Sequence, residues 1–292
     1  MSARFDCADP KQLEEGLQEA QAALRRGQLV VLPTDTVYGV AAEAFDPVAV
    51  DHLLAAKGRG RNMPPPVLVG TVRAAIALVQ DLGEMGKDLI EEFWPGGLTL
   101  IFKSSPTLVW DLGETKGTVA VRMPLHAVAL SLLKKTGPLA VSSANTSGQP
   151  PATTADEAVA QLGDSVAVYL DGGSCPGDVP STIVDLTGSV PRLLRAGVIS
   201  PDRLREVIPL AEADEYLADP AVRPDPVIPD ETDEPDETGP ADSAPGTGED
   251  EPGAAGSVAT VPGEADETGG AVASELTADE NGAAPEAPGQ VL

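Results

Sequence analysis

The chain has 292 residues and a formal net charge of −27, which is concentrated at its C-terminal end. Residues 211–292 carry 22 acidic side chains, one Arg and one aromatic residue, whereas residues 1–210 carry 24 acidic and 18 basic side chains. The sequence has no run of 18 apolar residues, no leader typical of a signal peptide, and only two Cys and two His, which argues against a membrane span, secretion, a disulfide framework and a His-based metal site.

This charge distribution predicts two parts of the chain. We expect residues 1–212 to form one folded domain, which is long enough to bury a proper core. Residues 213–292 are rich in Pro, Gly and acidic side chains, and such a segment cannot bury enough apolar surface to offset its ordering entropy. We therefore predict a disordered acidic tail over residues 213–292. Because the sequence has only two separated Cys residues and no segment typical of a signal peptide, we also expect a cytoplasmic location.

Apolar periodicity and capping residues predict helices and strands in alternation. The first helix is expected over residues 10–26, with Asp9 as its N-cap, Pro10 in its first turn and Gly27 after its end. Further helices are expected over residues 47–56, 72–80, 127–135, 154–162 and 201–207, with one more ending at Phe93. Short runs rich in β-branched residues predict strands over residues 29–32, 66–69, 98–102, 118–121, 139–142, 166–170, 182–186 and 192–194. The pattern predicts an α/β domain with a twisted mixed sheet flanked by helices.

Residues able to bind an anion gather in loops at the ends of these elements. They occupy residues 33–39 (PTDTVYG), 57–62 (KGRGRN), 118–124 (TVAVRMP), 142–148 (SSANTSG) and 180–182 (PST), with Arg195 beyond. Such loops commonly bind ligands in α/β proteins. Neither GxxxxGK[ST] nor GxGxxG occurs in the sequence. These loops contain Lys, Arg, Ser, Thr and Asn side chains, which could position the substrates of a nucleotidyl transfer and neutralise their negative charge. The same side chains could bind RNA phosphates almost equally well.

Each loop also has a simpler structural interpretation. Taken alone, the KGRGR run is most often a solvated basic turn, and the SSANTSG run is most often a capping turn. Arg122 follows an apolar strand, so it requires an anionic partner, which is either a ligand or a carboxylate of the protein itself. The residues alone therefore indicate an α/β domain that handles anions.

Seven blocks in a fixed order resemble the YrdC-like family. They are LPTDTVYG at residues 32–39, KGR at 57–59, WPGGLT at 94–99, residues 118–124, SSAN at 142–145, PSTI at 180–183, and Leu194 with Arg195. The resemblance covers residues 29–205 and implies a threonylcarbamoyl-AMP synthase of the short, single-domain type. Such a nucleotidyltransferase forms threonylcarbamoyl-AMP and pyrophosphate from L-threonine, bicarbonate or CO2, and ATP. The product feeds N6-threonylcarbamoyladenosine modification at tRNA position 37 through downstream threonylcarbamoyl transferase proteins.

The same resemblance implies roles for individual residues. The core of the catalytic site would be Lys57, Arg59, Ser143 and Asn145. ATP would contact these four residues together with Arg61, Asn62, Thr118 and Arg195. Threonine would contact Thr34, Arg122 and Ser181, with Arg122 pairing its carboxylate. No protein metal ligand is expected, since Mg²⁺ would be carried by the triphosphate.

Two alternatives use the same fold. One is a module that binds double-stranded RNA or tRNA and assists ribosome maturation, which should display an extended basic face. The net charge of −6 over residues 1–210 argues against such a face. The other is a paralogue that uses a different carbamoyl compound, against which the retention of Thr34, Arg122 and Ser181 argues.

Overall fold

The computed structural model describes residues 2–210, so the predicted tail and its boundary at residue 212 lie outside the described residues. The strands are β1 (Ala3–Asp6), β2 (Leu29–Leu32), β3 (Gly39–Glu43), β4 (Val67–Leu68), β5 (Leu98–Lys103), β6 (Thr118–Arg122), β7 (Leu139–Ser143), β8 (Val166–Asp171), β9 (Thr182–Asp185) and β10 (Arg192–Arg195). The helices are α1 (Pro10–Arg25), α2 (Pro47–Lys57), α3 (Val72–Leu78), α4 (Gly83–Phe93), α5 (Ala127–Thr136), α6 (Ala155–Leu162) and α7 (Pro201–Arg205), with a short 3-10 helix over Gly163–Ser165.

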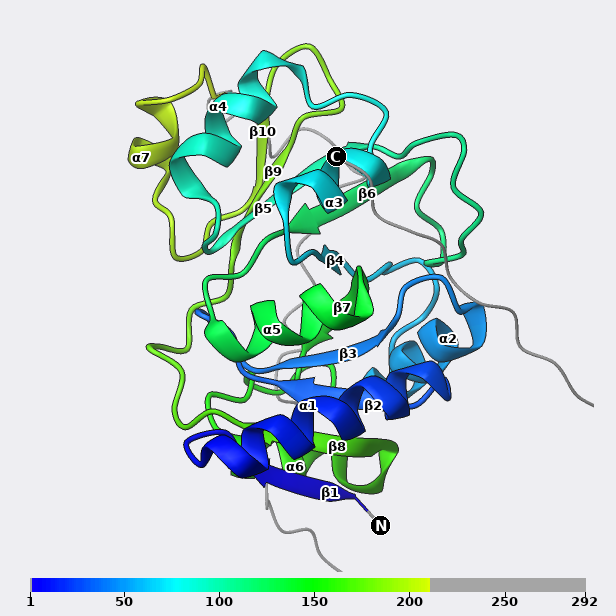
Figure 1. Cartoon of the computed structure of the whole chain (residues 1–292). Helices are drawn as coiled ribbons and strands as arrows, with labels where there is room; N and C mark the ends of the chain where they lie inside the picture. Colours follow the sequence, from blue (N-terminus) through cyan, green and yellow to red (C-terminus); the bar gives the residue numbers. More distant parts are fainter. Residues whose placement is uncertain (1, 211–292) are drawn as a thin grey trace, which may run out of the picture. The chain divides into compact units, whose positions relative to one another are not determined.

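The strands form one mixed sheet, in the order β1-β8-β2-β3-β7-β4-β6-β5-β9-β10 (Figure 1). Strand β8 pairs in parallel with both β1 and β2, β4 pairs in parallel with β6, and β5 pairs in parallel with β9. The remaining neighbours are antiparallel. Helices flank this sheet, which confirms the fold class expected from the sequence.

Local signals in the sequence set the ends of the helices. The carboxylate of Asp9 accepts a hydrogen bond from the Lys11 N–H at 2.8 Å, and Pro10 begins α1 as predicted. Asp46 caps α2 in the same way. Gly58 ends α2 with a φ of 64°, a left-handed conformation that a residue without a side chain adopts at no steric cost. The chain therefore turns sharply directly after Lys57.

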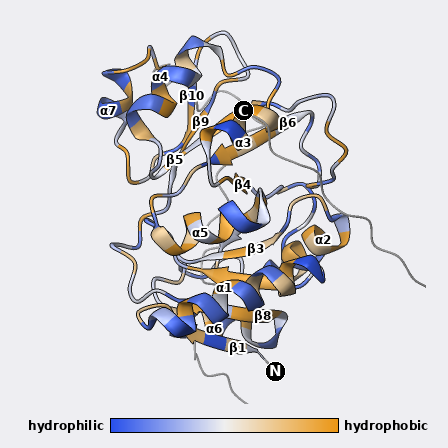
Figure 2. Ribbon diagram, viewed as in Figure 1, coloured by the Kyte–Doolittle hydropathy of each residue, from blue (hydrophilic) through white to orange (hydrophobic). Residues whose placement is uncertain are grey.

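Both faces of the sheet are covered. Successive side chains of a strand point to opposite faces, and in β2 Val30 and Leu32 pack with α1 and α5, whereas Leu29 and Val31 belong to the apolar cluster that contains α2. All four are buried, which explains why β2 reads as a continuous apolar run. Figure 2 shows hydrophobic residues along β3 and β8 as well.

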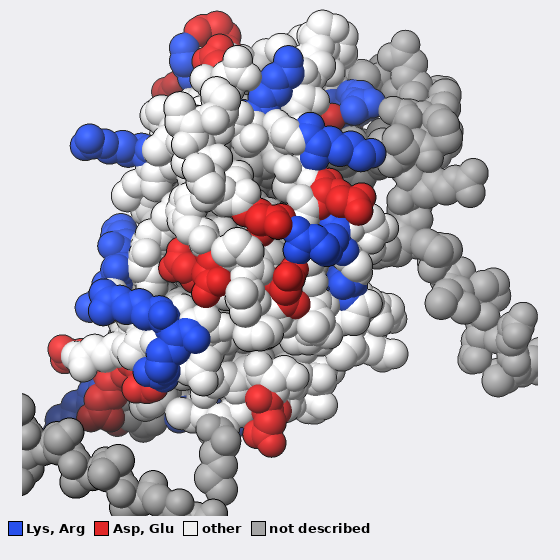
Figure 3. Space-filling view, turned by 90° about the vertical axis from the view of Figure 1, so that its right-hand side faces the viewer, with Lys and Arg blue, Asp and Glu red and all other residues white. Residues whose placement is uncertain are grey.

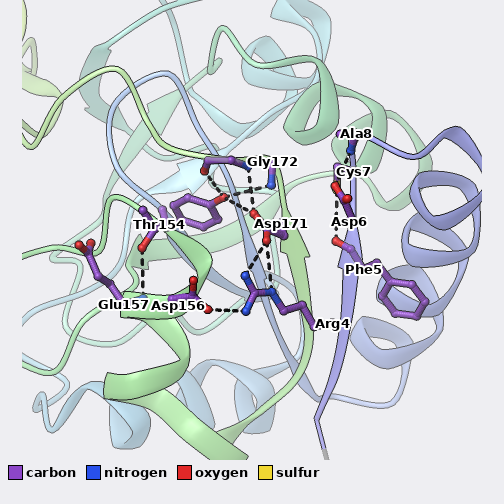
Figure 4. Close-up of polar contacts among 12 residues, drawn as sticks. Arg4, Phe5, Asp6, Cys7, Ala8, Thr154, Asp156, Glu157, Asp171 and Gly172 are labelled. Carbon is purple, nitrogen blue, oxygen red and sulfur yellow. Dashed lines mark hydrogen bonds and ion pairs between the residues drawn. The ribbon is translucent and has the colours of Figure 1, made fainter.

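Two strands lack a clear sequence signal. Strand β1 alternates between partly buried and exposed residues at the edge of the sheet. It pairs in parallel with β8, and Arg4 adds ion pairs with Asp156 of α6 and Asp171 of β8 (Figure 4). Strand β3 follows the 33–39 loop and consists mainly of small residues, and pairing with β2 and β7 on its two sides makes it a strand. Both strands depend on partners that are distant in the sequence.

Candidate functional site

A cavity of about 400 Å³ opens where several of the predicted loops meet. Six of the residues predicted for the site line it: Thr34, Arg59, Arg122, Ser143, Ser181 and Arg195. Its walls also include Met63, Pro64, Pro66, Pro151 and Pro180. The fold thus brings together side chains from the loops after β2, α2 and β7 and from strands β6, β9 and β10.

Arg122 already has an anionic partner within the protein. Its Nη2 donates to Asp35 Oδ1 at 2.6 Å, its Nη1 to Thr36 Oγ1 at 3.0 Å, and its Nε to the Gly96 carbonyl at 2.9 Å. Burial lowers the pKa of Arg122, and the charge of Asp35 opposes that shift. A guanidinium carries five N–H donors, so these three bonds leave two of them unused.

The hydroxyl of Thr34 closes the turn in which it lies. Thr34 Oγ1 donates to the Val37 carbonyl at 2.6 Å and accepts from the Thr36 N–H at 3.1 Å. A hydroxyl has a single proton, so Thr34 has no second one to donate to a substrate. The Thr36 hydroxyl lies 3.1 Å from that of Thr34 and receives the Arg122 bond, which makes Thr36 a site residue that the sequence argument missed.

Ser181 lies between a cation and a second hydroxyl. Arg195 Nη2 donates to Ser181 Oγ at 3.0 Å, and Thr99 Oγ1 lies 2.9 Å from the same atom. Thr99 is buried on β5, which pairs in parallel with β9 and so brings it beside Ser181. The β5–β9 pairing could not be read from the sequence, so the sequence argument missed Thr99.

Three arginines line this cavity. Burial lowers the pKa of Arg195, and the charges of Arg122 and Arg59 lower it further, which places the three guanidinium groups within electrostatic reach of one another. Arg59 Nε donates to Ser147 Oγ at 3.0 Å, so its guanidinium is held beside the 142–148 loop. An arrangement of this kind can offset the repulsion between two reacting anions.

Lys57 and Asn145 lie behind the cavity wall. Lys57 is 1% exposed, and its Nζ donates to oxygens of Ser143 and Asn145. Burial, with the charge of Arg59 added, lowers the pKa of Lys57 to about 7. The ammonium therefore contacts the protein rather than the cavity.

Three residues predicted to contact ATP lie elsewhere. Arg61 forms ion pairs with Asp51 and Asp111 on the surface. Asn62 is exposed, and the Thr118 hydroxyl donates to the Thr115 carbonyl at 2.8 Å. The structure therefore does not place Arg61, Asn62 or Thr118 among the residues that line the cavity.

Among residues 2–210, no three His, Cys, Asp or Glu side chains come together in a way that could hold a metal ion. No helix in the same range is long and apolar enough to cross a membrane.

Comparison with known proteins adds independent information. The Sua5/YciO/YrdC family model, described as telomere recombination, matches residues 22–197. A relative from Mycobacterium tuberculosis, provisionally named threonylcarbamoyl-AMP synthase, is 54% identical over 208 residues, or 71% of this chain and 96% of that protein. The threonylcarbamoyl-AMP synthase of Bacillus subtilis is 36% identical over 71% of this chain and 61% of its own length. The structure of P. abyssi Sua5 complexed with L-threonine aligns with a TM-score of 0.66 and 32% identity, over 72% of this chain and 62% of that one.

Proposed function

Because the chain belongs to the Sua5/YciO/YrdC family, we propose that it is a threonylcarbamoyl-AMP synthase. The observation that carries this proposal is the cavity in which Arg59, Arg122 and Arg195 converge. It is supported by the names of relatives that are 54% and 36% identical, and by an aligned structure that was solved with L-threonine.

The proposed reaction is a nucleotidyl transfer. The amine of threonine first forms an N–C bond with the carbon of bicarbonate, which loses water, or of CO2, with loss of a proton from the nitrogen. The resulting carbamate oxygen then attacks the α-phosphorus of ATP. A carbamoyl–phosphate bond forms, the bond to the β-phosphate oxygen breaks, and pyrophosphate leaves. Both reactants are anions, so fixed positive charge around the cavity lowers the barrier to their approach.

The geometry favours a particular division of roles. Arg59 and Arg195, at the edge of the cavity, would hold phosphate oxygens with their planar guanidinium groups. Arg122 would hold the carboxylate of threonine with its two remaining N–H donors. The hydroxyls of Ser181 and Thr36, which also line the cavity, would contact the amino acid beside Arg122, and Ser143 would contact the nucleotide.

Mg²⁺ would enter with ATP, because this ion is commonly held by the phosphates of its substrate. Bicarbonate or CO2 would be the third substrate, and a tRNA threonylcarbamoyl transferase would consume the product. We place this reaction in the cytoplasm, which fits the two free thiols, Cys7 and Cys175.

The face of the molecule drawn in Figure 3 favours the synthase over an RNA-binding module. On the face drawn in Figure 3, basic side chains are interspersed with acidic ones, and no extended basic surface forms there. The distribution of charge on this face therefore favours a small-molecule enzyme over a protein that binds tRNA or double-stranded RNA directly.

Incubation with ATP, bicarbonate and L-threonine tests the proposal. We expect pyrophosphate release that depends on threonine, with threonylcarbamoyl-AMP detected by mass spectrometry. Omission of bicarbonate, with CO2 removed from the buffer, is the control. Tight binding of double-stranded RNA without any threonine-dependent turnover would contradict the proposal and favour the RNA-binding alternative.

A further inference from the structure

Lys57 is the last residue of α2, and its ammonium is enclosed by oxygens of the 143–146 turn. Its Nζ donates to the Ser143 carbonyl at 2.6 Å, to the Asn145 carbonyl at 2.6 Å and to Asn145 Oδ1 at 3.0 Å. An ammonium has three N–H donors, and these three oxygens account for all of them. No donor is left to bind a phosphate oxygen.

The amide of Asn145 is equally committed to the turn. Its Oδ1 accepts from Lys57, and its Nδ2 donates to the carbonyls of Thr146 at 2.9 Å and Gln149 at 2.7 Å. An Asn amide has two N–H donors, so both are used. Asn145 therefore stabilises the turn from within and offers no free donor to a nucleotide.

The backbone ties the same turn to the end of α2. The Ser147 N–H donates to the Lys57 carbonyl at 2.9 Å, and Arg59 Nε donates to Ser147 Oγ at 3.0 Å. Lys57 thus contacts the turn with both its side chain and its backbone. These contacts fix the 143–148 segment relative to Arg59.

Arg59 and Ser143, in contrast, face the cavity. Both line it, whereas Lys57 and Asn145 do not. The nearest contact of Ser143 Oγ with the Lys57 ammonium is long, at 3.4 Å, so its hydroxyl is free to turn toward a ligand. Lys57 and Asn145 therefore hold the turn together, whereas Arg59 and Ser143 line the cavity.

We propose that Lys57 and Asn145 are positioning residues, which hold the 143–148 turn so that Ser143 and Arg59 meet the phosphates of ATP. This inference rests on the proposed function, and it differs from the phosphate-binding role that the family resemblance implies for Lys57. Moving the ammonium toward a phosphate would leave the carbonyl and the Oδ1 of Asn145 without their donor, and such unpaired buried polar groups are costly. In this proposal the ammonium of Lys57 stabilises the turn, and this turn positions the groups that contact ATP.

Hydrogen exchange tests the positioning without any substrate. In the full chain, Lys57→Met should speed amide exchange in residues 143–149 at least about tenfold, with exchange in β2 and β8 unchanged. Asn145→Ala perturbs the same turn from its other side and should give the same local effect, which keeps the test valid if Lys57→Met does not fold. Lys134→Met, an exposed position on α5, is the matched control. Unchanged exchange over residues 143–149 in the folded variants would overturn the proposal.

A crystal structure of the wild-type chain with a non-hydrolysable ATP analogue tests the substrate side. We expect Lys57 Nζ to stay on the Ser143 and Asn145 carbonyls, and the phosphates to contact Arg59 and Ser143. A phosphate oxygen within hydrogen-bond distance of Lys57 Nζ would overturn the inference. In kinetics, the double variant Lys57→Met/Asn145→Ala should lose no more kcat/KM for ATP than the worse single variant, because both changes release the same turn. Full additivity would therefore also count against the inference.

A wild-type chain with no threonine-dependent turnover would refute the proposed function instead, and the exchange experiment would still decide this inference.

Discussion

Removal of the Arg122 guanidinium is the sharpest test of how the cavity holds an amino acid. Arg122→Met alone would leave Asp35 buried without its partner, and breaking a buried pair in this way costs about 3–5 kcal/mol of stability. The change is therefore best made in an Asp35→Asn background. Asn keeps an oxygen that can accept from the Leu125 N–H, as Asp35 does now at 2.9 Å, and leaves no stranded charge.

The expected magnitude follows from the donors that the protein leaves unused. Two of the five guanidinium N–H groups of Arg122 remain for the carboxylate of threonine. Each charge-assisted bond is worth about 1.5–3 kcal/mol. Their joint loss should lower kcat/KM for threonine by roughly 10²- to 10⁴-fold relative to Asp35→Asn alone.

Serine provides the internal control for this experiment. It has the same carboxylate as threonine and lacks only a methyl group, which is worth roughly 1–3 kcal/mol in an apolar pocket. Pyrophosphate release should therefore fall by the same factor with both amino acids, and their ratio should hold. A variant that keeps its kcat/KM for threonine, or that changes only the threonine-to-serine ratio, would refute the carboxylate role of Arg122.

Four further predictions address other parts of the molecule. Arg59→Ala should raise KM for ATP about tenfold to a hundredfold, whereas Arg61→Ala, whose ion pairs lie outside the cavity, should leave it nearly unchanged. As pH rises through about 7, Lys57 loses a proton and one of its three donors, so kcat/KM for ATP should fall, and Lys57→Met should flatten that profile. Tyr38→Phe removes the hydroxyl that donates to the Gly173 carbonyl at 2.6 Å and should lower the free energy of unfolding by about 1–3 kcal/mol. Removal of residues 214–292 should leave adenylate synthesis nearly unchanged.

Each of these predictions has a result that contradicts it. Equal KM values for ATP in the Arg59→Ala and Arg61→Ala variants would place Arg59 outside the nucleotide site. A pH profile that persists in Lys57→Met would assign the ionisation to another group. Denaturant unfolding should register the Tyr38→Phe change, and an unaltered midpoint would show that the hydroxyl contributes nothing. Loss of turnover on truncation would show that the domain extends beyond residue 213.

Hydrophobic patterning predicted most of the elements but missed those that depend on distant partners. Helices α1 and α2 begin where their caps were expected, because a cap such as Asp9 acts within one turn of chain. Strand β3 has little intrinsic signal, and it forms through pairing with β7, about 100 residues further along. The predicted strand over residues 66–69 is observed as Val67–Leu68. Backbone hydrogen bonds from the Val69 N–H to the Arg122 carbonyl and from the Val141 N–H to the Pro66 carbonyl continue the pairing at its two ends.

The motifs likewise located the site but did not assign its hydrogen bonds. The motifs predicted Thr34, Arg122 and Ser181 as site residues, and all three line the cavity. Sequence reasoning left open whether the partner of Arg122 is a ligand or a carboxylate of the protein. Tertiary structure places Asp35 there, 87 residues away in the chain, and still leaves two donors free.

The sequence by itself determined the fold class, the family, and the loops in which the chemistry resides, because these follow from local periodicity and from ordered motifs. Only the tertiary structure decided which side chains retain unused donors. Lys57 and Arg59 are two residues apart in one basic run, yet the first is enclosed by carbonyl oxygens and the second lines the cavity. The physical reason is that each polar group makes a fixed number of hydrogen bonds. Contacts with residues far along the chain determine how many of those bonds the protein itself uses.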